Sequence, residues 1–520
     1  MDFVGRDLFT APLQTTLRQF EEADNFGSLI RPDVTDVDGM LKILESKNVS
    51  GHLFLSLTHQ KVLQALRQAD YLSPKYHVVI ANPPYMGSRN MSGSMASWLK
   101  QNYGDFKSDF FSAFIVRNTE LALPMGQLGF MTPFTWMFIS TYEQLRVKLL
   151  NEKHISSLIQ LEYSGFEGAT VPICTFTVTN RPSMASGFYV DLTSFVGPQK
   201  QQPNALYAIQ HPSCGWAYQA TSDELLKIPS APIAYWASHQ IRKIFAESMA
   251  LGDKYQPRQG MATSDNNRFL RCWFEVTANN IGYGYENAQE ANSSRKRWFP
   301  YNKGGDFRKW YGNNTFVIDW LNDGKAVLAY AKELYGSPTR TIKNIQFYFV
   351  PCVTWTYISS SFFGVRYSPP GFLFDVAGSS VFAPISKLML LTGYMTSSVA
   401  NVFLQVINPT LNFQAGNIAA LPWNEGLVEK YATRIDATVR ISVEITQHDW
   451  DSYETSWDFS SLPLLRPDYR QPTLKATYQK LRAHWRETTL EMQRLEKENN
   501  CIFIEAYGLE DELTPEVPLS

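Results

Sequence analysis

The stretch Tyr76-His77-Val78-Val79-Ile80-Ala81-Asn82-Pro83-Pro84-Tyr85 joins a short apolar run to a rigid turn. Its β-branched residues favour a buried strand, and the two consecutive prolines end that strand because proline cannot donate to a β-ladder. In an open α/β sheet, ligands bind beyond the carboxyl ends of the strands. The stretch therefore predicts a strand over 76–81 that carries residues 82–85 into a binding crevice.

The sequence on both sides of this stretch predicts an α/β sheet. Apolar residues recur at helical spacing in several segments, and β-branched runs separate them. The expected helices are 58–72, 110–123 and 142–150, and the further strands are 128–132, 155–162 and 170–180. Because strands and helices alternate at these intervals, we expect a sheet that is mainly parallel.

Beyond about residue 190 this alternation stops. Residues 240–420 combine short strand-like runs with many Gly, Asn and aromatic residues, and the segment 474–499 is a long amphipathic helix pattern. The expected organisation is a partial catalytic domain at 1–190, a mixed α+β domain at 191–425 and a helical segment at 426–520.

The composition is that of a folded protein with reduced thiols. Apolar residues make up 44% and charged residues 18%, which excludes a disordered chain. The 5 Cys have neither paired nor metal-ligand spacing, so we expect no metal site. The N-terminus lacks a secretory pattern and no apolar run is as long as a membrane span, which predicts a cytoplasmic protein of a bacterium or archaeon.

Residues 82–85 have the chemistry needed to methylate an exocyclic amine. Such an amine on adenine is a poor nucleophile, because its lone pair is delocalised into the ring. The side-chain oxygen of Asn82 and the carbonyl of Pro83 can accept hydrogen bonds from the amine and direct its lone pair toward a methyl donor. Pro84 helps to hold these acceptors rigidly. Tyr85 supplies a ring on which a base rotated out of a duplex can stack.

The tetrapeptide defines the reaction better than the substrate. A glutamine amide or an amine of an RNA base fits the same acceptors, and Asn-Pro-Pro also occurs in plain turns. A nuclease is not indicated, because the sequence has no clear metal-binding cluster of the PD…ExK type.

The surrounding sequence resembles an amino-methyltransferase family in which a Gly-rich cofactor motif precedes the Asn-Pro-Pro-Tyr motif. The matching stretches are 107–114 (KSDFFSAF), 126–133 (GQLGFMTP) and 165–171 (GFEGATV). The later sequence resembles PglX-like enzymes, which are adenine methyltransferases of bacteriophage-exclusion systems related to combined restriction-modification enzymes. The stretches that carry this resemblance are 260–269 (GMATSDNNRF), 298–305 (WFPYNKGG), 309–313 (KWYGN), 374–380 (FDVAGSS), 408–414 (NPTLNFQ) and 507–514 (YGLEDELT).

The resemblance implies part of an adenine-specific (N6) DNA methyltransferase for phage defence or restriction-modification. It implies S-adenosylmethionine as the cofactor, double-stranded DNA as a partner, and a catalytic loop made of Asn82, Pro83, Pro84 and Tyr85. By the same resemblance Phe114 packs on the adenine of the cofactor, and a place in the apolar core is the alternative for this ring.

Local charge supports a DNA-facing middle region independently of the resemblance. Residues 251–350 hold 14 Lys and Arg against 9 Asp and Glu, a net +5 in a chain of net charge −2. Basic residues interleaved with Trp and Tyr suit phosphate contacts and base stacking, whereas a solvated charged face is the alternative. The candidate DNA-binding residues are Arg268, Arg295, Lys296, Arg297, Lys303, Arg308 and Lys309.

The sequence departs from the family before the catalytic loop. A complete enzyme of this kind has a strand, a Gly-rich turn and a helix there, but the glycines at positions 5, 27, 39 and 51 are isolated. We therefore expect a partial Rossmann-like sheet, an incomplete cofactor site, and a partner that supplies the N-terminal methyltransferase half or is another defence-system subunit. The alternatives are a catalytically silent DNA-recognition subunit and a methyltransferase acting on RNA or a protein amide.

Overall fold

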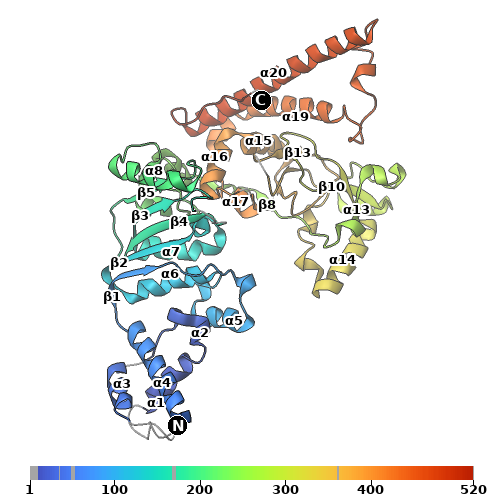
Figure 1. Ribbon diagram of the computed structural model, residues 1–520. Coiled ribbons are helices and arrows are strands. Elements are labelled where there is room, and N and C mark those ends of the chain that lie inside the picture. Colours follow the sequence, from blue (N-terminus) through green and yellow to red (C-terminus); the bar gives the residue numbers. More distant parts are fainter. Residues whose placement is uncertain are drawn as a thin grey trace. The chain divides into compact units, whose positions relative to one another are not determined.

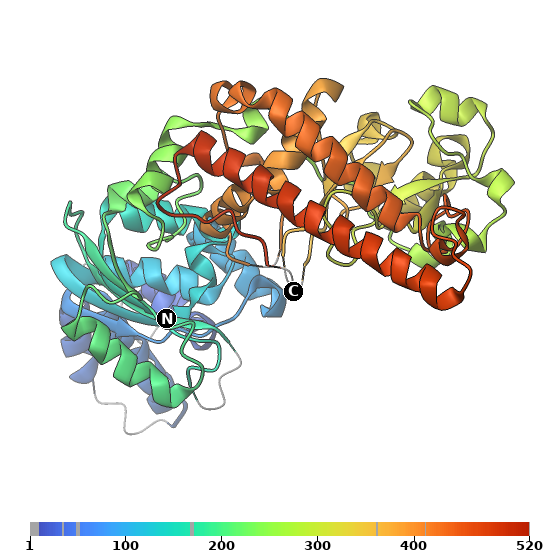
Figure 2. The same cartoon turned by 90° about the horizontal axis from the view of Figure 1, so that it is seen from above.

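The computed structural model describes residues 10–33, 36–47, 53–166, 171–359, 362–410 and 412–518. Two of the stretches that carry the family resemblance are therefore incomplete in it, because residues 167–170 and 411 lie outside the described part. The chain forms two compact units, Met1–Ala237 and Ser238–Ser520, and each is described by itself (Figures 1 and 2).

The first unit is built on a six-stranded sheet in the order β1-β2-β4-β3-β5-β6. Its strands are β1 (Tyr76–Ala81), β2 (Ala122–Pro133), β3 (His154–Gln160), β4 (Ile173–Thr179), β5 (Gly187–Asp191) and β6 (Ala217–Ala220). β1 is parallel to β2 and β3 to β5, whereas β4 is antiparallel to β2 and β3, and β6 is antiparallel to β5. The expectation of a mainly parallel sheet is wrong, because β4 follows β3 with no helix among the described residues between them, and such a direct return gives antiparallel neighbours.

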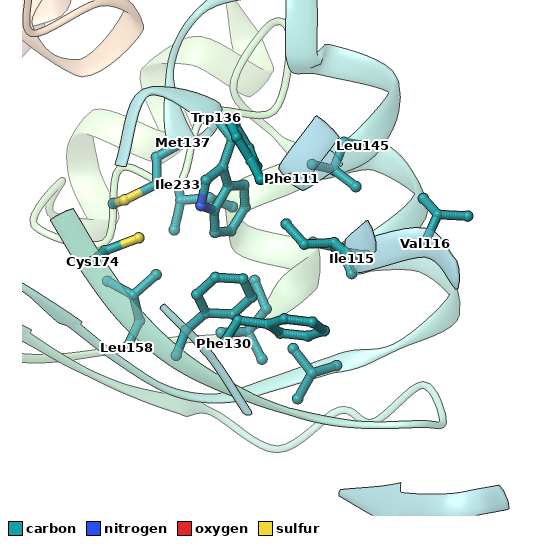
Figure 3. Close-up of a cluster of buried hydrophobic side chains, with 14 of the residues drawn as sticks. Phe111, Ile115, Val116, Phe130, Trp136, Met137, Leu145, Leu158, Cys174 and Ile233 are labelled. Carbon is teal, nitrogen blue, oxygen red and sulfur yellow. The ribbon is translucent and has the colours of Figure 1, made fainter. Parts of the chain in front are cut away.

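Helices α6 (Phe110–Leu121) and α7 (Glu143–Glu152) cover one face of this sheet. Alternate residues of the strands point into that layer, as period-2 strand geometry requires. Figure 3 shows the resulting core, in which side chains of α6 meet the ring of Trp136 and residues of β2, β3 and β4. Its labelled members include Phe111, Ile115, Phe130, Leu158 and Cys174.

The opposite face of the sheet is open over β1, β2 and β4. Val78 is 58% and Ile80 is 80% exposed, and both belong to the edge strand β1. Ile80 lies beside Gly129 of β2, which has no side chain to cover it, and Gly129 pairs with Thr177 of β4. The strand expected over 76–81 therefore has the right extent, but its expected burial is wrong, because only one of its faces is packed. Helix α8 (Pro198–Gln210) covers the part of this face formed by β3 and β5.

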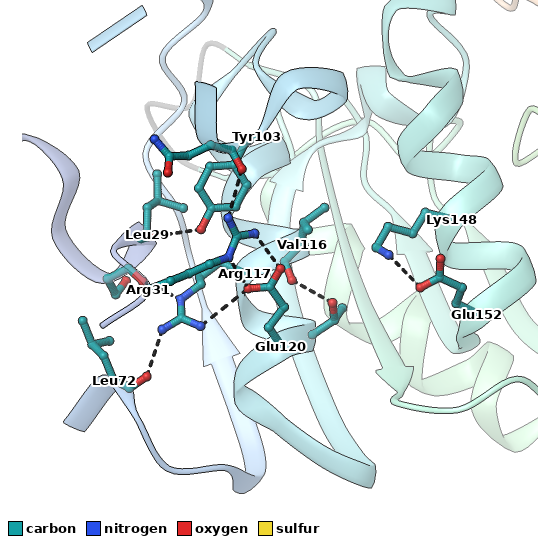
Figure 4. Close-up of polar contacts among 12 residues, drawn as sticks. Leu29, Arg31, Leu72, Tyr103, Val116, Arg117, Glu120, Lys148 and Glu152 are labelled. Carbon is teal, nitrogen blue, oxygen red and sulfur yellow. Dashed lines mark hydrogen bonds and ion pairs between the residues drawn. The ribbon is translucent and has the colours of Figure 1, made fainter. Parts of the chain in front are cut away.

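Among the described residues, four α-helices precede the sheet and have an apolar cluster of their own. They are α1 (Thr10–Gln19), α2 (Ala23–Phe26), α3 (Val37–Glu45) and α4 (Leu53–Leu72). A polar network joins them to α6 (Figure 4). Arg31 donates to the Glu120 carboxylate at 2.6 and 2.7 Å, and Arg117 donates to the carbonyls of Ser28 and Leu72. These bonds fix the amino-terminal helices against α6.

The first unit extends past the domain boundary expected near residue 190. β6 pairs with β5, and Ile233 and Tyr235 are buried in the core of Figure 3, so the chain up to Ala237 packs with the sheet. The remaining helices of this unit are α5 (Gly93–Asn102) and α9 (Ser222–Leu226).

The second unit contains two four-stranded sheets, with the orders β14-β10-β11-β9 and β13-β12-β15-β8. Their strands are β8 (Gln256–Arg258), β9 (Leu270–Cys272), β10 (Trp298–Asn302), β11 (Phe316–Asp319), β12 (Cys352–Trp355), β13 (Val365–Ser368), β14 (Leu373–Phe374) and β15 (Ser380–Phe382). A short ladder joins β7 (Met249–Ala250) to β16 (Pro422–Trp423).

The carboxyl-terminal part of this unit is helical, as expected. Helices α19 (Ala432–Trp450) and α20 (Leu474–Tyr507) pack on each other, and α15 (Ile385–Thr396) and α16 (Ser398–Ile407) pack beneath them. The other helices are α10 (His239–Glu247), α11 (Leu251–Lys254), α12 (Asn266–Phe269), α13 (Ala288–Ser293), α14 (Leu321–Tyr335), α17 (Ala415–Ala419) and α18 (Glu425–Lys430). The expected fold class, a partial α/β sheet followed by a mixed α+β region and a helical segment, is confirmed.

Among the described residues, no single helix is long and apolar enough to cross a bilayer. α15 and α16 reach the required length and composition only as a pair, across a bend of 69°. Most residues of both helices are buried in the second unit.

Arg146 of α7 is a structural arginine, and its replacement tests how the first unit is held together. Its guanidinium is fully buried and donates five hydrogen bonds of 2.8–3.1 Å to the carbonyls of Trp136, Ile139, Ser230 and Ala231. Arg146→Met would remove the donor from the carbonyls of Trp136, Ser230 and Ala231, while Ile139 keeps the Tyr142 N–H, and should lower the free energy of unfolding by about 2–4 kcal/mol. Urea denaturation followed by circular dichroism measures this.

The exposed Arg181 provides the matched control. Arg181→Met should change stability by less than about 0.5 kcal/mol. Equal effects of the two substitutions would contradict the structural role of Arg146.

Candidate active site

The Asn-Pro-Pro-Tyr loop leaves the carboxyl end of the edge strand β1. Pro83 is buried, whereas Asn82, Pro84 and Tyr85 are exposed, so the loop is anchored at one residue and open at the others. β1 and β2 are parallel, and their carboxyl ends therefore lie at the same edge of the sheet. This is the edge at which ligands bind in open α/β sheets.

The Tyr85 hydroxyl holds the side chain of Asn82. It donates to Asn82 Oδ1 at 3.0 Å and also lies 3.3 Å from the carbonyl of Met131, near the carboxyl end of β2. Partial burial raises the pKa of Tyr85, with a further contribution from Cys174, so this hydroxyl stays protonated and able to donate. The bond fixes the orientation of the Asn82 amide and leaves one lone pair of Oδ1 free for a second donor.

Asp109 anchors the far end of the loop, and sequence reasoning assigned it no role. Its Oδ1 accepts hydrogen bonds from the main-chain N–H groups of Met86 at 3.0 Å and Phe111 at 3.2 Å. The same carboxylate is the N-cap of α6, and Phe110 N–H donates back to the Met86 carbonyl. Burial raises the pKa of Asp109, although the bonds from main-chain N–H groups act in the opposite direction. The signal in the sequence was an Asp directly before an apolar helix, which is a common N-cap.

Phe114 lies in α6 and is partly buried against the core of the first unit. Its ring is 6.2 Å from that of Phe110, in a tilted arrangement. The side chain thus has a core contact on one side and an accessible surface on the other, so both interpretations of this ring remain predictions.

The seven candidate DNA-binding residues do not form one cluster. Arg268 stacks its guanidinium over Tyr330 at 4.8 Å. Arg295 is exposed at a positive φ of 55°, and Lys296 donates to the carbonyl of Asn279. Arg297 binds the buried carboxylate of Asp319 at 2.8 Å. The residues from 295 to 297 precede β10, so they lie at its amino end.

The other three candidates follow β10, at its carboxyl end. Lys303 binds the buried Asp375 at 2.6 Å, and Lys309 binds Glu496 of α20 at 3.0 Å. Arg308 is 3.5 Å from Asp449 of α19 and lies over the ring of Trp450. Partners within the second unit therefore neutralise much of the positive charge that the sequence places here.

A buried network joins three of the stretches that carried the family resemblance. Asp375 accepts hydrogen bonds from Tyr301 at 2.8 Å, from Lys303 and from the main chain of Ala377. The Met261 N–H donates to the carbonyl of Phe374, the residue before Asp375. These contacts give Tyr301, Lys303, Asp375 and Met261 a structural role in packing the three stretches together. Within the described residues, no group of three or more His, Cys, Asp or Glu could hold a metal ion.

The fold and the loop together define a class. Residues 20–166 match the family described as Eco57I restriction-modification methylase. The solved structure of the type IIL restriction-modification enzyme MmeI, in complex with DNA, aligns with 88% of this chain and 56% of its own, with a TM-score of 0.50 and 12% identity. The chain therefore has the fold of restriction-modification methyltransferases.

More particularly, the chain is similar along nearly its whole length to two adenine-specific methyltransferases. It is 32% identical to PglX of Lacticaseibacillus casei (strain Zhang) over 98% of this chain and 43% of PglX. It is 30% identical to BrxX of Escherichia coli O9:H4 (strain HS) over 96% of this chain and 40% of BrxX. The resemblance to PglX-like methyltransferases is confirmed, and the chain spans less than half the length of these relatives.

Two substitutions of Asp109 separate its acceptor atoms from its charge. Asp109→Ala removes the acceptor of two main-chain N–H groups and should lower the free energy of unfolding by about 1–2 kcal/mol. Asp109→Asn keeps an acceptor and loses a buried charge, so its cost should be smaller. Urea denaturation at pH 7 compares the two variants.

The pH dependence checks the charge. Because burial raises the pKa of Asp109 in the folded state, protonation at lower pH favours the folded over the unfolded wild-type chain at this position. The stability of wild type relative to Asp109→Asn should therefore rise as the pH falls through that raised pKa. A fall instead would mean that the ionised carboxylate stabilises the fold.

Proposed function

We propose that this chain is the catalytic-loop and target-recognition part of an adenine N6 DNA methyltransferase. The observation that carries the proposal is the exposed Asn82–Tyr85 pair at the carboxyl end of β1, with the amide held by the Tyr85 hydroxyl. The similarity to PglX and BrxX over nearly the whole chain favours adenine in DNA as the acceptor and phage defence as the setting.

The loop acts on the amine in three ways. Asn82 Oδ1 and the Pro83 carbonyl accept hydrogen bonds from the two amine N–H groups, which keeps the lone pair off the ring and turns it toward the methyl donor. Pro84 fixes the main chain directly after the Pro83 carbonyl. The Tyr85 ring stacks on a base rotated out of the duplex, and its hydroxyl keeps Asn82 oriented.

S-adenosylmethionine fits the chemistry of this loop, and it would supply the electrophilic methyl group. In this chain, the carboxyl end of β1 and the accessible side of Phe114 border the region it would occupy. No Gly-rich turn between a strand and a helix precedes β1 among the described residues, so these residues form only part of a cofactor site.

The bare edge and bare face of β1 support a further segment that completes the sheet. The outer edge of β1 has main-chain groups free to pair, and Val78 and Ile80 present apolar side chains beside it. Folded soluble proteins rarely leave an apolar strand edge of this kind exposed to solvent. We infer that a strand and helix carrying the Gly-rich turn pack here, from a longer polypeptide or a separate one.

A second candidate function is DNA recognition without catalysis. The partial cofactor site favours it, whereas the intact and oriented Asn82–Tyr85 pair favours an active loop. Methylation of RNA or of a protein amide would use the same loop. These alternatives do not account for the aromatic and basic residues of the second unit.

Substitution of Asn82 tests the chemistry in the assembled enzyme. Asn82→Ala removes an acceptor that matters most when the amine attacks, so the methylation rate should fall at least about 100-fold while the Kd for DNA changes little. Transfer of radiolabelled methyl groups to duplex DNA measures the rate. The nearby exposed Asn90 is the control, because Asn90→Ala should leave the rate unchanged.

Tyr85 variants report on stacking in the same assay. Tyr85→Ala should weaken binding by about 1–3 kcal/mol, whereas Tyr85→Phe keeps the ring and should retain most of that affinity. Near-normal methylation by Asn82→Ala would contradict the proposed role of Asn82 as an acceptor for the amine.

Substitution of Ile80 tests the docking of the cofactor-binding segment. Ile80→Asp should abolish assembly with a Gly-rich methyltransferase segment, because a carboxylate cannot be buried unpaired in an apolar contact. Calorimetric titration of the mixture with S-adenosylmethionine measures assembly through cofactor affinity.

The control is Met184, which is 87% exposed between β4 and β5. Met184→Asp adds the same charge to the same unit and should leave assembly intact. Equal cofactor affinity for the two variants would contradict docking at β1.

A further inference from the structure

Arg366 is a buried guanidinium with little to bind. It lies in β13 and is 2% exposed. Its Nη1 donates to Thr356 Oγ1 at 3.1 Å and to the Gly364 carbonyl at 3.5 Å, and none of the acidic side chains in the described part of the chain forms an ion pair with it. An arginine has five N–H donors, and burial of its charge without an anion is costly.

The first unit shows how this chain satisfies a structural arginine. The equally buried Arg146 makes five hydrogen bonds to carbonyl oxygens, which spread over all three of its nitrogens. Arg366 makes two bonds, both from one nitrogen. Hydrogen bonds within the fold are therefore sufficient to explain why Arg146 is buried. They are not sufficient to explain the burial of Arg366.

A second arginine charge lies near Arg366 and adds to its cost. Burial, and then the charge of Arg308, lower the pKa of Arg366 to about 10. Gly364, next to β13, is so close to Arg308 that an added Cβ would lie 2.9 Å from the Arg308 carbonyl. The second unit thus keeps two like charges together, with Asp449 at 3.5 Å from Arg308 as the nearby anion.

Thr356 links Arg366 to the loop 304–308, which has main-chain donors without acceptors. Gly304 and Gly305 have φ values of 85° and 116°, which side chains rarely allow. Residues 305–307 are exposed, and none of their N–H groups has a hydrogen-bond acceptor within the described residues, whereas Gly304 is buried against Gly378. Thr356 Oγ1 donates to the Gly305 carbonyl, so this carbonyl points inward and the N–H of the same peptide unit, which belongs to Asp306, points outward.

Exposed aromatic rings flank the loop. Phe307 is 42% and Phe362 is 64% exposed, and their ring centroids are 5.7 Å apart. Glycine-rich loops with free N–H groups bind anions, and rings beside them suit the sugars or bases of a nucleic acid strand. Asp306 is the acidic side chain of this loop, and it is exposed.

We propose that the loop 304–308 binds one phosphate of the DNA backbone through the main-chain N–H groups of its exposed residues 305–307 and through Arg308, with the buried positive charge of Arg366 linked to the loop through Thr356. This site rests on the proposed DNA-recognition role and gives it a location. Arg366 acts as a positioning residue, because it offsets the phosphate charge without leaving the core. The phosphate in turn supplies an anion for Arg366, which has none within the described residues, whereas Arg308 already has Asp449 at 3.5 Å.

Four variants of the full 520-residue chain test the site on duplex DNA. Arg366→Met removes the buried charge and should weaken DNA binding about tenfold at low salt, while Arg366→Lys keeps a charge and should bind much better than the Met variant. Arg308→Met should lower the slope of log affinity against log salt by about one, the value for one lost phosphate. Asp306→Asn removes a repulsive carboxylate and should strengthen binding.

Thermal unfolding separates a binding role from a structural one. Because Arg366 is a buried charge without an anion in the free chain, Arg366→Met should leave the melting temperature of free protein unchanged or raise it. Arg434 of α19, which binds Glu498, is the control arginine, and Arg434→Met should not change DNA affinity.

Three results would overturn the site. They are equal DNA affinities of the Met and Lys variants of Arg366, an unchanged salt slope in Arg308→Met, and a lower melting temperature in Arg366→Met with DNA affinity lost in proportion. If wild type binds DNA and the variants match it, the phosphate site alone is wrong. If wild type does not bind duplex DNA, the proposed recognition function fails as well.

Discussion

The parallel pairing of β1 with β2 determines where the Asn-Pro-Pro-Tyr loop lies in the first unit. It brings the carboxyl ends of both strands to one edge of the sheet, so that Tyr85 after β1 reaches the Met131 carbonyl near the end of β2. The position of the Asn82 amide then follows from the Tyr85 hydroxyl. A shift of one residue in this register would turn Val79 and Ala81 out of the core and move the loop from β2.

The same loop is tied to α6 through Asp109, and α6 is tied to the amino-terminal helices through Arg117. The site is therefore supported from two sides by helices and sheet, while its third side is the bare edge of β1. Under the proposed function this asymmetry would separate two tasks, because the acceptor side would be rigid within this chain and the donor side would be open to another segment.

The sequence was sufficient for much of the local structure and for the exposed position of the Asn-Pro-Pro-Tyr loop after β1. The extent of β1 followed from β-branched residues ending at two prolines, and α6 and α20 followed from apolar spacing. The antiparallel place of β4 could not be predicted, because strand direction depends on long-range pairing and not on residue pattern. Nor could the ion pairs of Lys303 and Lys309, since Asp375 and Glu496 are distant in sequence. A count of basic residues overstated the free charge for this reason.

Free charge, and not total charge, decides where a protein of net −2 can meet DNA. In the second unit, the carboxylates of Asp319, Asp375 and Glu496 form ion pairs with three basic residues that the sequence predicted to contact phosphates. These are Arg297, Lys303 and Lys309. An arginine that remains buried without a carboxylate is then more informative than several exposed ones, because its cost must be offset by something. Arg366 lies in no basic run of the sequence, so a count of basic residues does not single it out. Its place in the structure does, because Thr356 links it to the loop 304–308.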